Sequence, residues 1–237
     1  MVFGESAFII GASLTAINVA FIVITAIAAR TIGLGVAEID ILSGPTLFSF
    51  RVGEMTVVVK PIPIGSGIRF REHGTANECK APSTEPFRSL SDLSCCQQMA
   101  LALSTPISFL LAAFALVGGS IGHHVATALP EIYVGALRPT TVGVDLLKHY
   151  VEAWHAAPLV ALGLLAAKYG VYLLMPTAGS PGFVAAAVIL KKIFDYDMSS
   201  DFNRVAAMFL FIPPMVVLGG WTVATFWFLY PLLDSAI

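Results

Sequence analysis

The segment AFIIGASLTAINVAFIVITAIAA (residues 7–29) runs directly into RTIGLGVAEIDILSGPTLFSFRVGEMTVVVKPIPIGSGIRF (residues 30–70), and these two stretches decide the fold. The first is uncharged over 23 residues, and about 20 helical residues are enough to cross the hydrocarbon core of a bilayer. The second contains two β-rich runs, SGPTLFSF and MTVVVKPIPI, separated by the turn-like residues 51–54. We therefore predict a membrane-spanning helix followed by a membrane-associated β-hairpin at about residues 45–70.

The composition indicates an integral membrane protein. Apolar residues make up 57% of the chain and charged residues 12%, and the mean hydropathy is +0.84. The net charge of −2, without any stretch that alternates basic and aromatic residues, excludes a basic nucleic-acid-binding protein. The three cysteines, Cys79, Cys95 and Cys96, do not have the spacing of a structural zinc site, and their odd number argues against structural disulfides.

The rest of the chain predicts an α-helical polytopic protein built as a single membrane domain over residues 1–237. We expect about four transmembrane helices, a short half-helix at Phe183–Phe194 before the last of them, and a break at Pro130. Proline and glycine pairs in the last span predict a kinked or interrupted helix. The expected spans cover about residues 7–29, 99–118, 155–175 and 205–232, joined by a cytoplasmic loop (71–97) and an extracytoplasmic connection (119–154) with a short helix in VDLLKHYVEAW.

The distribution of Lys and Arg predicts the orientation. Residues 30–97 hold seven of them and residues 176–204 hold three, whereas the 119–154 connection holds two. Because positively charged loops stay in the cytoplasm, we expect both termini to be extracytoplasmic. The expected location is the inner (cytoplasmic) membrane of a bacterium, as a multi-pass protein.

Several motifs in this order resemble the site-2 protease family of intramembrane zinc metalloproteases. In that family a first-span HExxH helix precedes a motif like ExxxGFGPxLF and a hairpin that ends in an IPLGGYVKF-like strand. The second span carries AGPxxNF, which resembles Ser104–Phe109 here, and the third carries GxxNLLPxPxLDGG, which resembles Gly170–Phe183. The matching positions in the first stretch are Glu38, Gly44, Pro45, Leu47, Phe48, Pro63, Gly65 and Phe70.

The chain departs from the family at the catalytic positions. The two histidines and the glutamate of HExxH fall on Phe21, Thr25 and Ile22, and the third metal ligand, the Asp of LDGG, falls on Pro181. The Asn of NLLP falls on Leu173. A catalytic zinc needs about three protein ligands and a general base, which these side chains do not provide. The resemblance therefore implies a member without catalytic activity, and we expect no cofactor.

A relocated metal or haem site is an alternative. The candidate ligands lie in the connection and its flanks, although one helix cannot present His149, Glu152 and His155 together to one ion. Interfacial histidines facing water or headgroups are the simpler interpretation. The candidates are His123, His124, Glu131, His149, Glu152 and His155.

Lys168 is the one charge well inside a predicted span. Intramembrane charges usually face a partner or a cavity. We expect Lys168 either to snorkel toward the cytoplasmic end of its helix or to pair with an acidic group on a partner subunit.

The main functional hypothesis is a binding, scaffold or accessory subunit of a larger membrane complex, whose partners are the lipid bilayer and other transmembrane subunits. An exposed edge at Thr56–Lys60, with Thr56, Val58 and Lys60 as contacts, is predicted to pair with a partner strand. The alternatives are an active protease with a non-standard ligand set and a small transporter or channel component, whose sign would be Pro- and Gly-broken helices. Neither nucleic acid nor a soluble small-molecule substrate is indicated.

Overall fold

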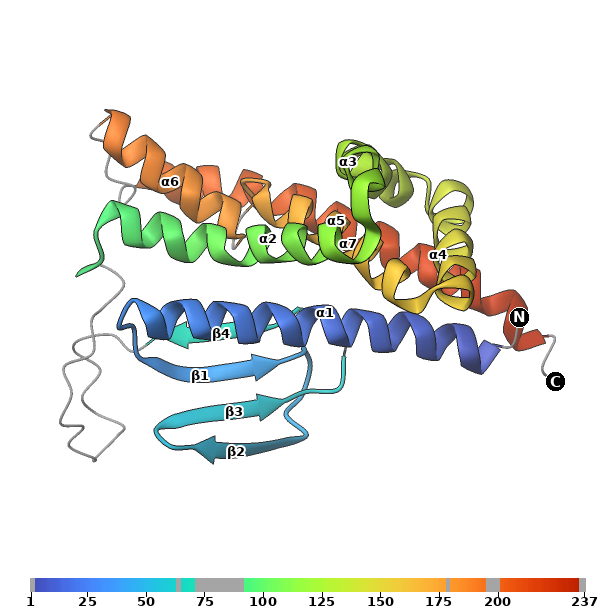
Figure 1. The fold of residues 1–237 in the computed structure, drawn as a ribbon, viewed down its shortest axis with the longest axis horizontal. Coiled ribbons are helices and arrows are strands. Elements are labelled where there is room, and N and C mark those ends of the chain that lie inside the picture. The colour runs from blue at the N-terminus through green and yellow to red at the C-terminus, as the bar shows by residue number, and fades with distance from the viewer. Residues whose placement is uncertain (1–2, 63–64, 71–91, 178–179, 195–200, 235–237) are drawn as a thin grey trace. The chain divides into compact units, whose positions relative to one another are not determined.

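The computed structural model describes residues 3–62, 65–70, 92–177, 180–194 and 201–234 (Figure 1). The chain divides into two compact units. One comprises Leu14–Thr105, and the other comprises Met1–Ser13 together with Pro106–Ile237. Helices α1 (Phe3–Thr31) and α2 (Cys95–Val117) contribute to both units.

The unit Leu14–Thr105 contains a four-stranded sheet with the order β2-β3-β1-β4. Strand β3 pairs antiparallel with β2 and parallel with β1, and β1 pairs antiparallel with β4. The strands are β1 (Val36–Ile41), β2 (Phe48–Val52), β3 (Met55–Val59) and β4 (Gly67–Phe70). The predicted β-hairpin is therefore confirmed as β2–β3, but it belongs to a larger mixed sheet.

Alternation of side chains gives this sheet one apolar face. The register places Phe50, Val57, Ile39 and Ile68 side by side on that face. Ile39 and Val57 are buried, whereas Phe50 on the edge strand is exposed. The other face carries the ion pairs Lys60–Asp40 (2.9 Å) and Arg69–Glu38 (3.8 Å). The end of α1 and the start of α2 join the sheet in one apolar cluster.

The second unit consists of helices. After α2, a 3₁₀ turn (Gly118–Ser120) leads into α3 (Ile121–Leu137), a π-helical turn η3 (Pro139–Gly143), α4 (Val144–Ala156) and α5 (Pro158–Leu174). Helices α6 (Pro181–Phe194) and α7 (Asp201–Asp234) complete it. Small residues allow close crossings: a Cβ on Gly220 of α7 would lie 2.1 Å from the Ala136 carbonyl oxygen of α3.

The helices agree in part with the prediction of a polytopic membrane protein. Three helical stretches among the described residues are long and apolar enough to cross a membrane: Gly4–Thr31, Cys95–Leu137 and Leu210–Pro231. The predicted third span corresponds to α5, an apolar helix of 17 residues that falls below that length. The half-helix predicted at Phe183–Phe194 is confirmed as α6, and the short helix in VDLLKHYVEAW as α4.

The break predicted at Pro130 was wrong, because helix α3 continues through it. Of the two forms predicted for the last span, kinked or interrupted, interruption is excluded, because α7 is a continuous α-helix through Pro213, Pro214 and the two glycines. Apolar helices tolerate proline because neighbouring helices and local adjustments compensate for the lost hydrogen bond. The 119–154 connection, for which a short helix in VDLLKHYVEAW was predicted, is almost entirely helical. The predicted 71–97 loop lies largely outside the described residues, and α2 already begins at Cys95.

Candidate functional site

The positions of the protease's HExxH motif lie on α1 and are used for helix packing. Ile22 is 3% exposed. The Thr25 hydroxyl donates to the Phe21 carbonyl oxygen at 2.8 Å and lies 2.8 Å from the Thr105 hydroxyl of α2. Of these three side chains only Thr25 has a polar atom, and its hydrogen bonds are made within the protein.

The other two positions of the resemblance, Leu173 and Pro181, lie on either side of the connection between α5 and α6. Leu173 is buried near the end of α5. The Ser180 hydroxyl donates to the Met175 carbonyl oxygen at 2.6 Å and accepts the Phe183 N–H at 3.0 Å. Ser180 thus caps α6, and Pro181 occupies its first turn, where proline's missing N–H has no cost. This local role explains the proline at the position of the protease's ligating aspartate.

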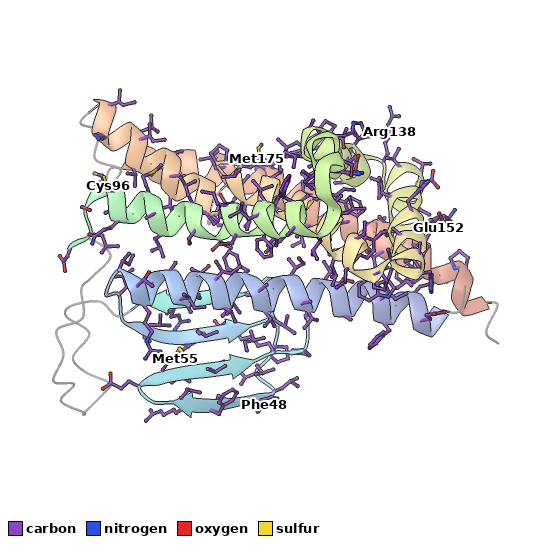
Figure 2. All side chains as sticks on the ribbon, in the orientation of Figure 1. Phe48, Met55, Cys96, Arg138, Glu152 and Met175 are labelled. Atoms are coloured by element: carbon purple, nitrogen blue, oxygen red, sulfur yellow. The ribbon has the colours of Figure 1, made fainter. Side chains whose placement is uncertain are left out.

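The candidate ligands for a relocated metal make separate contacts. The His149 ring Nδ1 bonds to the Asp145 carbonyl oxygen at 2.7 Å, and His155 lies 3.8 Å from Glu5. His123 and His124 pack edge to face with their ring centroids 5.7 Å apart, and Glu152 is exposed on α4 (Figure 2). Over the described part of the chain, no three His, Cys, Asp or Glu side chains gather closely enough to hold a metal ion.

Lys168 has an acidic partner within the same chain. Its Nζ lies 2.5 Å from Oε2 of Glu131 on α3, and both side chains are about 30% exposed. An acidic counter-ion for Lys168 is therefore supplied within the chain, because the fold brings α3 against α5. Glu131, considered above only as a metal ligand, serves as this counter-ion.

The predicted partner-binding edge is also corrected. Strand β3, which contains Thr56 and Val58, pairs on one side with β2 and on the other with β1. Its backbone groups are used within the sheet, and the Lys60 ammonium pairs with Asp40. The sheet is completed by β1, whose sequence VAEIDI alternates as a strand should. That alternation was the available signal for β1.

Within the sheet of described residues, β2 is the edge strand next to β3, and its other side has no partner strand. All five of its residues are exposed, and the Phe48 and Phe50 rings stack with centroids 6.3 Å apart. Gly53 has φ 63° and begins the two-residue turn into β3, as the first central residue of a type II′ turn does. In such a turn Val52 and Met55 form the hydrogen-bonded pair.

In an antiparallel ladder, hydrogen-bonded pairs alternate with non-hydrogen-bonded pairs, and this alternation identifies the backbone groups of β2 that do not bond to β3. Phe50 and Phe48 form the next hydrogen-bonded pairs with β3, so the N–H and C=O groups of Ser49 and Arg51 point to the open side. An added strand would bond to these two residues. The arrangement can therefore bind an extended peptide with apolar residues beside Phe48 and Phe50.

Comparison with protein-family models, with curated proteins and with solved structures gives no match for this chain.

Proposed function

We propose that this chain is a catalytically inactive membrane protein of the site-2 protease type, which acts as a scaffold or accessory subunit of a larger complex and binds an extended partner segment along β2. The observation that supports binding is the exposed β2 strand with its aromatic face, whose outer edge has no partner strand among the described residues. Edge strands normally carry protection against pairing, and here Arg51 is the one charge on the strand. Strand addition would use main-chain bonds for affinity and the alternate side chains for specificity.

The sheet is tied to the span from which it emerges. The Ser66 hydroxyl donates to the Asn18 side-chain oxygen at 3.0 Å, and Asn18 is anchored by its own bond to the Leu14 carbonyl oxygen. Only the residues 32–35 separate the end of α1 from β1. A partner strand on β2 would thus be held close to the membrane, on the side that the Lys and Arg distribution assigns to the cytoplasm of a bacterial cell.

The proposed loss of catalysis rests on side-chain chemistry. Phe21, Ile22, Leu173 and Pro181 have no metal-binding atom, and Thr25 bonds to Phe21 and Thr105. A zinc-dependent peptidase needs deprotonated or neutral nitrogen, sulfur or oxygen ligands. Zinc at one atom per purified chain, together with chelator-sensitive cleavage of a membrane substrate, would contradict this part of the proposal.

The binding part is tested by site-specific crosslinking in intact membranes. A photoreactive residue at Ser49 should give a discrete adduct to a membrane protein, whereas the same residue at Thr56 in the interior strand should not. Replacing Phe50 by Ala in the Ser49 photoprobe should weaken the adduct. Adducts of equal yield from both positions would mean that β2 is not the binding edge.

Blocking the edge provides a matched pair of variants. Ser49→Pro removes an N–H that points away from β3, so the hairpin should survive, whereas Ser49→Ala keeps that N–H. Partner co-purification in a gentle detergent should be lost in the proline variant and kept in the alanine variant. Retention of the same partner by both variants would refute strand addition.

A further inference from the structure

Helix α3 crosses α7, an arrangement that the sequence did not predict. Figure 1 shows α3 nearly end on, whereas α7 of the same unit runs lengthwise across the view. The crossing is close: a Cβ on Gly135 would lie 2.7 Å from the Trp221 ring, and the Trp221 indole N–H donates to the Ile132 carbonyl oxygen at 3.1 Å. Helix α3 therefore lies across α7 and is fixed to it by the inward face of its second half.

The sequence of α7 indicates how deep in a bilayer this crossing would lie. Gly220, which meets Ala136, precedes Pro231 by 11 residues, or about 16 Å of helix. Exposed apolar side chains continue along α7 past the crossing, including Phe226 and Trp227. If α7 spans a bilayer, the bilayer must extend past the level of α3. A helix at that level cannot lie wholly in water.

The contacts between α5 and α2 are consistent with that depth. A Cβ on Gly163 would approach Leu116 and Val117 of α2, and one on Gly170 would approach Phe109 and Leu110, so the two helices run antiparallel. Lys168 lies between these levels, still along the apolar part of α2. Its flexible four-carbon stem allows the ammonium to reach Glu131 on α3.

The outward face of α3 is apolar. Val134 and Leu137 are 41% and 67% exposed, and Ala126 and Pro130 continue the same exposed stripe toward the start of the helix. The helix is flanked by exposed basic groups, His123 in its first turn and Arg138 directly after its end (Figure 2). The stripe suits contact with acyl chains, and the long Arg138 side chain can extend from the end of the helix toward the headgroups.

We infer that α3 is an in-plane helix embedded within the bilayer at the depth of its crossing with α7, and that its outward stripe contacts lipid acyl chains. The inference rests on the membrane placement in the proposed function. It replaces the expectation that residues 119–154 lie outside the membrane. The Glu131–Lys168 ion pair and the Gly135–Trp221 contact hold the helix to the bundle from its other side.

The test uses the full chain with Cys79, Cys95 and Cys96 replaced by serine, reconstituted in liposomes, with one new cysteine at a time. Val134→Cys probes the stripe, Asp145→Cys on α4 is the water control, and Val216→Cys on α7 is the span control. A membrane-impermeant maleimide should modify Val134→Cys at least about tenfold more slowly than Asp145→Cys. A fluorophore at Val134→Cys should be quenched by lipids brominated on the acyl chain.

The possible outcomes distinguish the placement of α3 from the proposed membrane placement of α7. Rapid modification of Val134→Cys with a protected Val216→Cys would overturn the placement of α3 alone. Rapid modification of Val216→Cys would show instead that α7 is not in the membrane. Protection of Val134→Cys without quenching by brominated lipid would mean that protein covers the stripe, which also overturns the inference.

Discussion

Replacing Gly220 by alanine should separate α7 from α3 at their closest crossing. The added Cβ would lie 2.1 Å from the Ala136 carbonyl oxygen and 2.6 Å from two further backbone atoms. Close contacts of this kind have carbon–oxygen distances of about 3.3 Å, so the backbones must move apart by about 1 Å. The obstacle is main chain, which cannot rotate away as a side-chain tip can.

That displacement sets the magnitude. Overpacking of a well-packed core typically costs about 1–3 kcal/mol, and a gap of 0.5–1 Å loses about a quarter to a half of each dispersion contact nearby. The contacts of Gly135 with Trp221 and of Gly143 with Ala224 lie at the same crossing. We therefore expect Gly220→Ala to lower the free energy of unfolding by about 2–3 kcal/mol.

Gly219→Ala is the matched control. Nothing lies within 4 Å of a Cβ built on Gly219, and the same substitution there should stabilise the helix by up to about 1 kcal/mol through propensity. Unfolding is measured by titration with a denaturing detergent, followed by tryptophan fluorescence, to which Trp221 at the crossing contributes. Equal stabilities of the two variants within about 0.5 kcal/mol would refute the close crossing.

Substitutions at three further contacts test them one by one. Glu131→Gln and Lys168→Met should each lower the free energy of unfolding, and their double-mutant cycle should give a coupling energy of about 1–3 kcal/mol; additive effects would show that the 2.5 Å pair is not formed. Thr105→Val should cost about 0.6 kcal/mol in the wild-type chain and almost nothing in a Thr25→Val background, because it removes the 2.8 Å contact between the two hydroxyls; the same cost in both backgrounds would exclude that contact. Trp221→Phe should cost about 1 kcal/mol by removing the bond to Ile132 and should leave fluorescence quenching at a labelled Val134→Cys unchanged; a fall in that quenching would mean that the indole bond also sets the position of α3.

Local chemistry was sufficient for the elements that the sequence predicted. The uncharged run of residues 7–29 is helical because apolar length and the absence of breakers act within one segment. Gly53 fixes the β2–β3 turn through its positive φ, and α6 begins at Pro181, close to the predicted start. These features depend on neighbours a few residues away.

The effect of proline, in contrast, could not be predicted from residues a few positions away. Pro130 and the Pro213–Pro214 pair lie inside continuous helices. Proline's cost depends on whether surrounding helices satisfy the freed backbone group, and this is a property of the packing. The third predicted span also differs from the structure, since α5 is shorter than the apolar segment of residues 155–175 from which the span was predicted.

By itself the sequence determined that this chain is apolar enough for a membrane, that the apolar run of residues 7–29 precedes a β-hairpin, and that Phe21, Ile22, Thr25 and Pro181 stand where the resembling motifs would carry ligands and base. Only the tertiary structure decided that β1 covers the edge of β3 and leaves β2 open, and that Lys168 pairs with Glu131. The physical reason is separation along the chain: Glu131 and Lys168 are 37 residues apart. Which distant backbone edge or charge becomes a neighbour depends on how the elements pack, and residue type alone does not specify that.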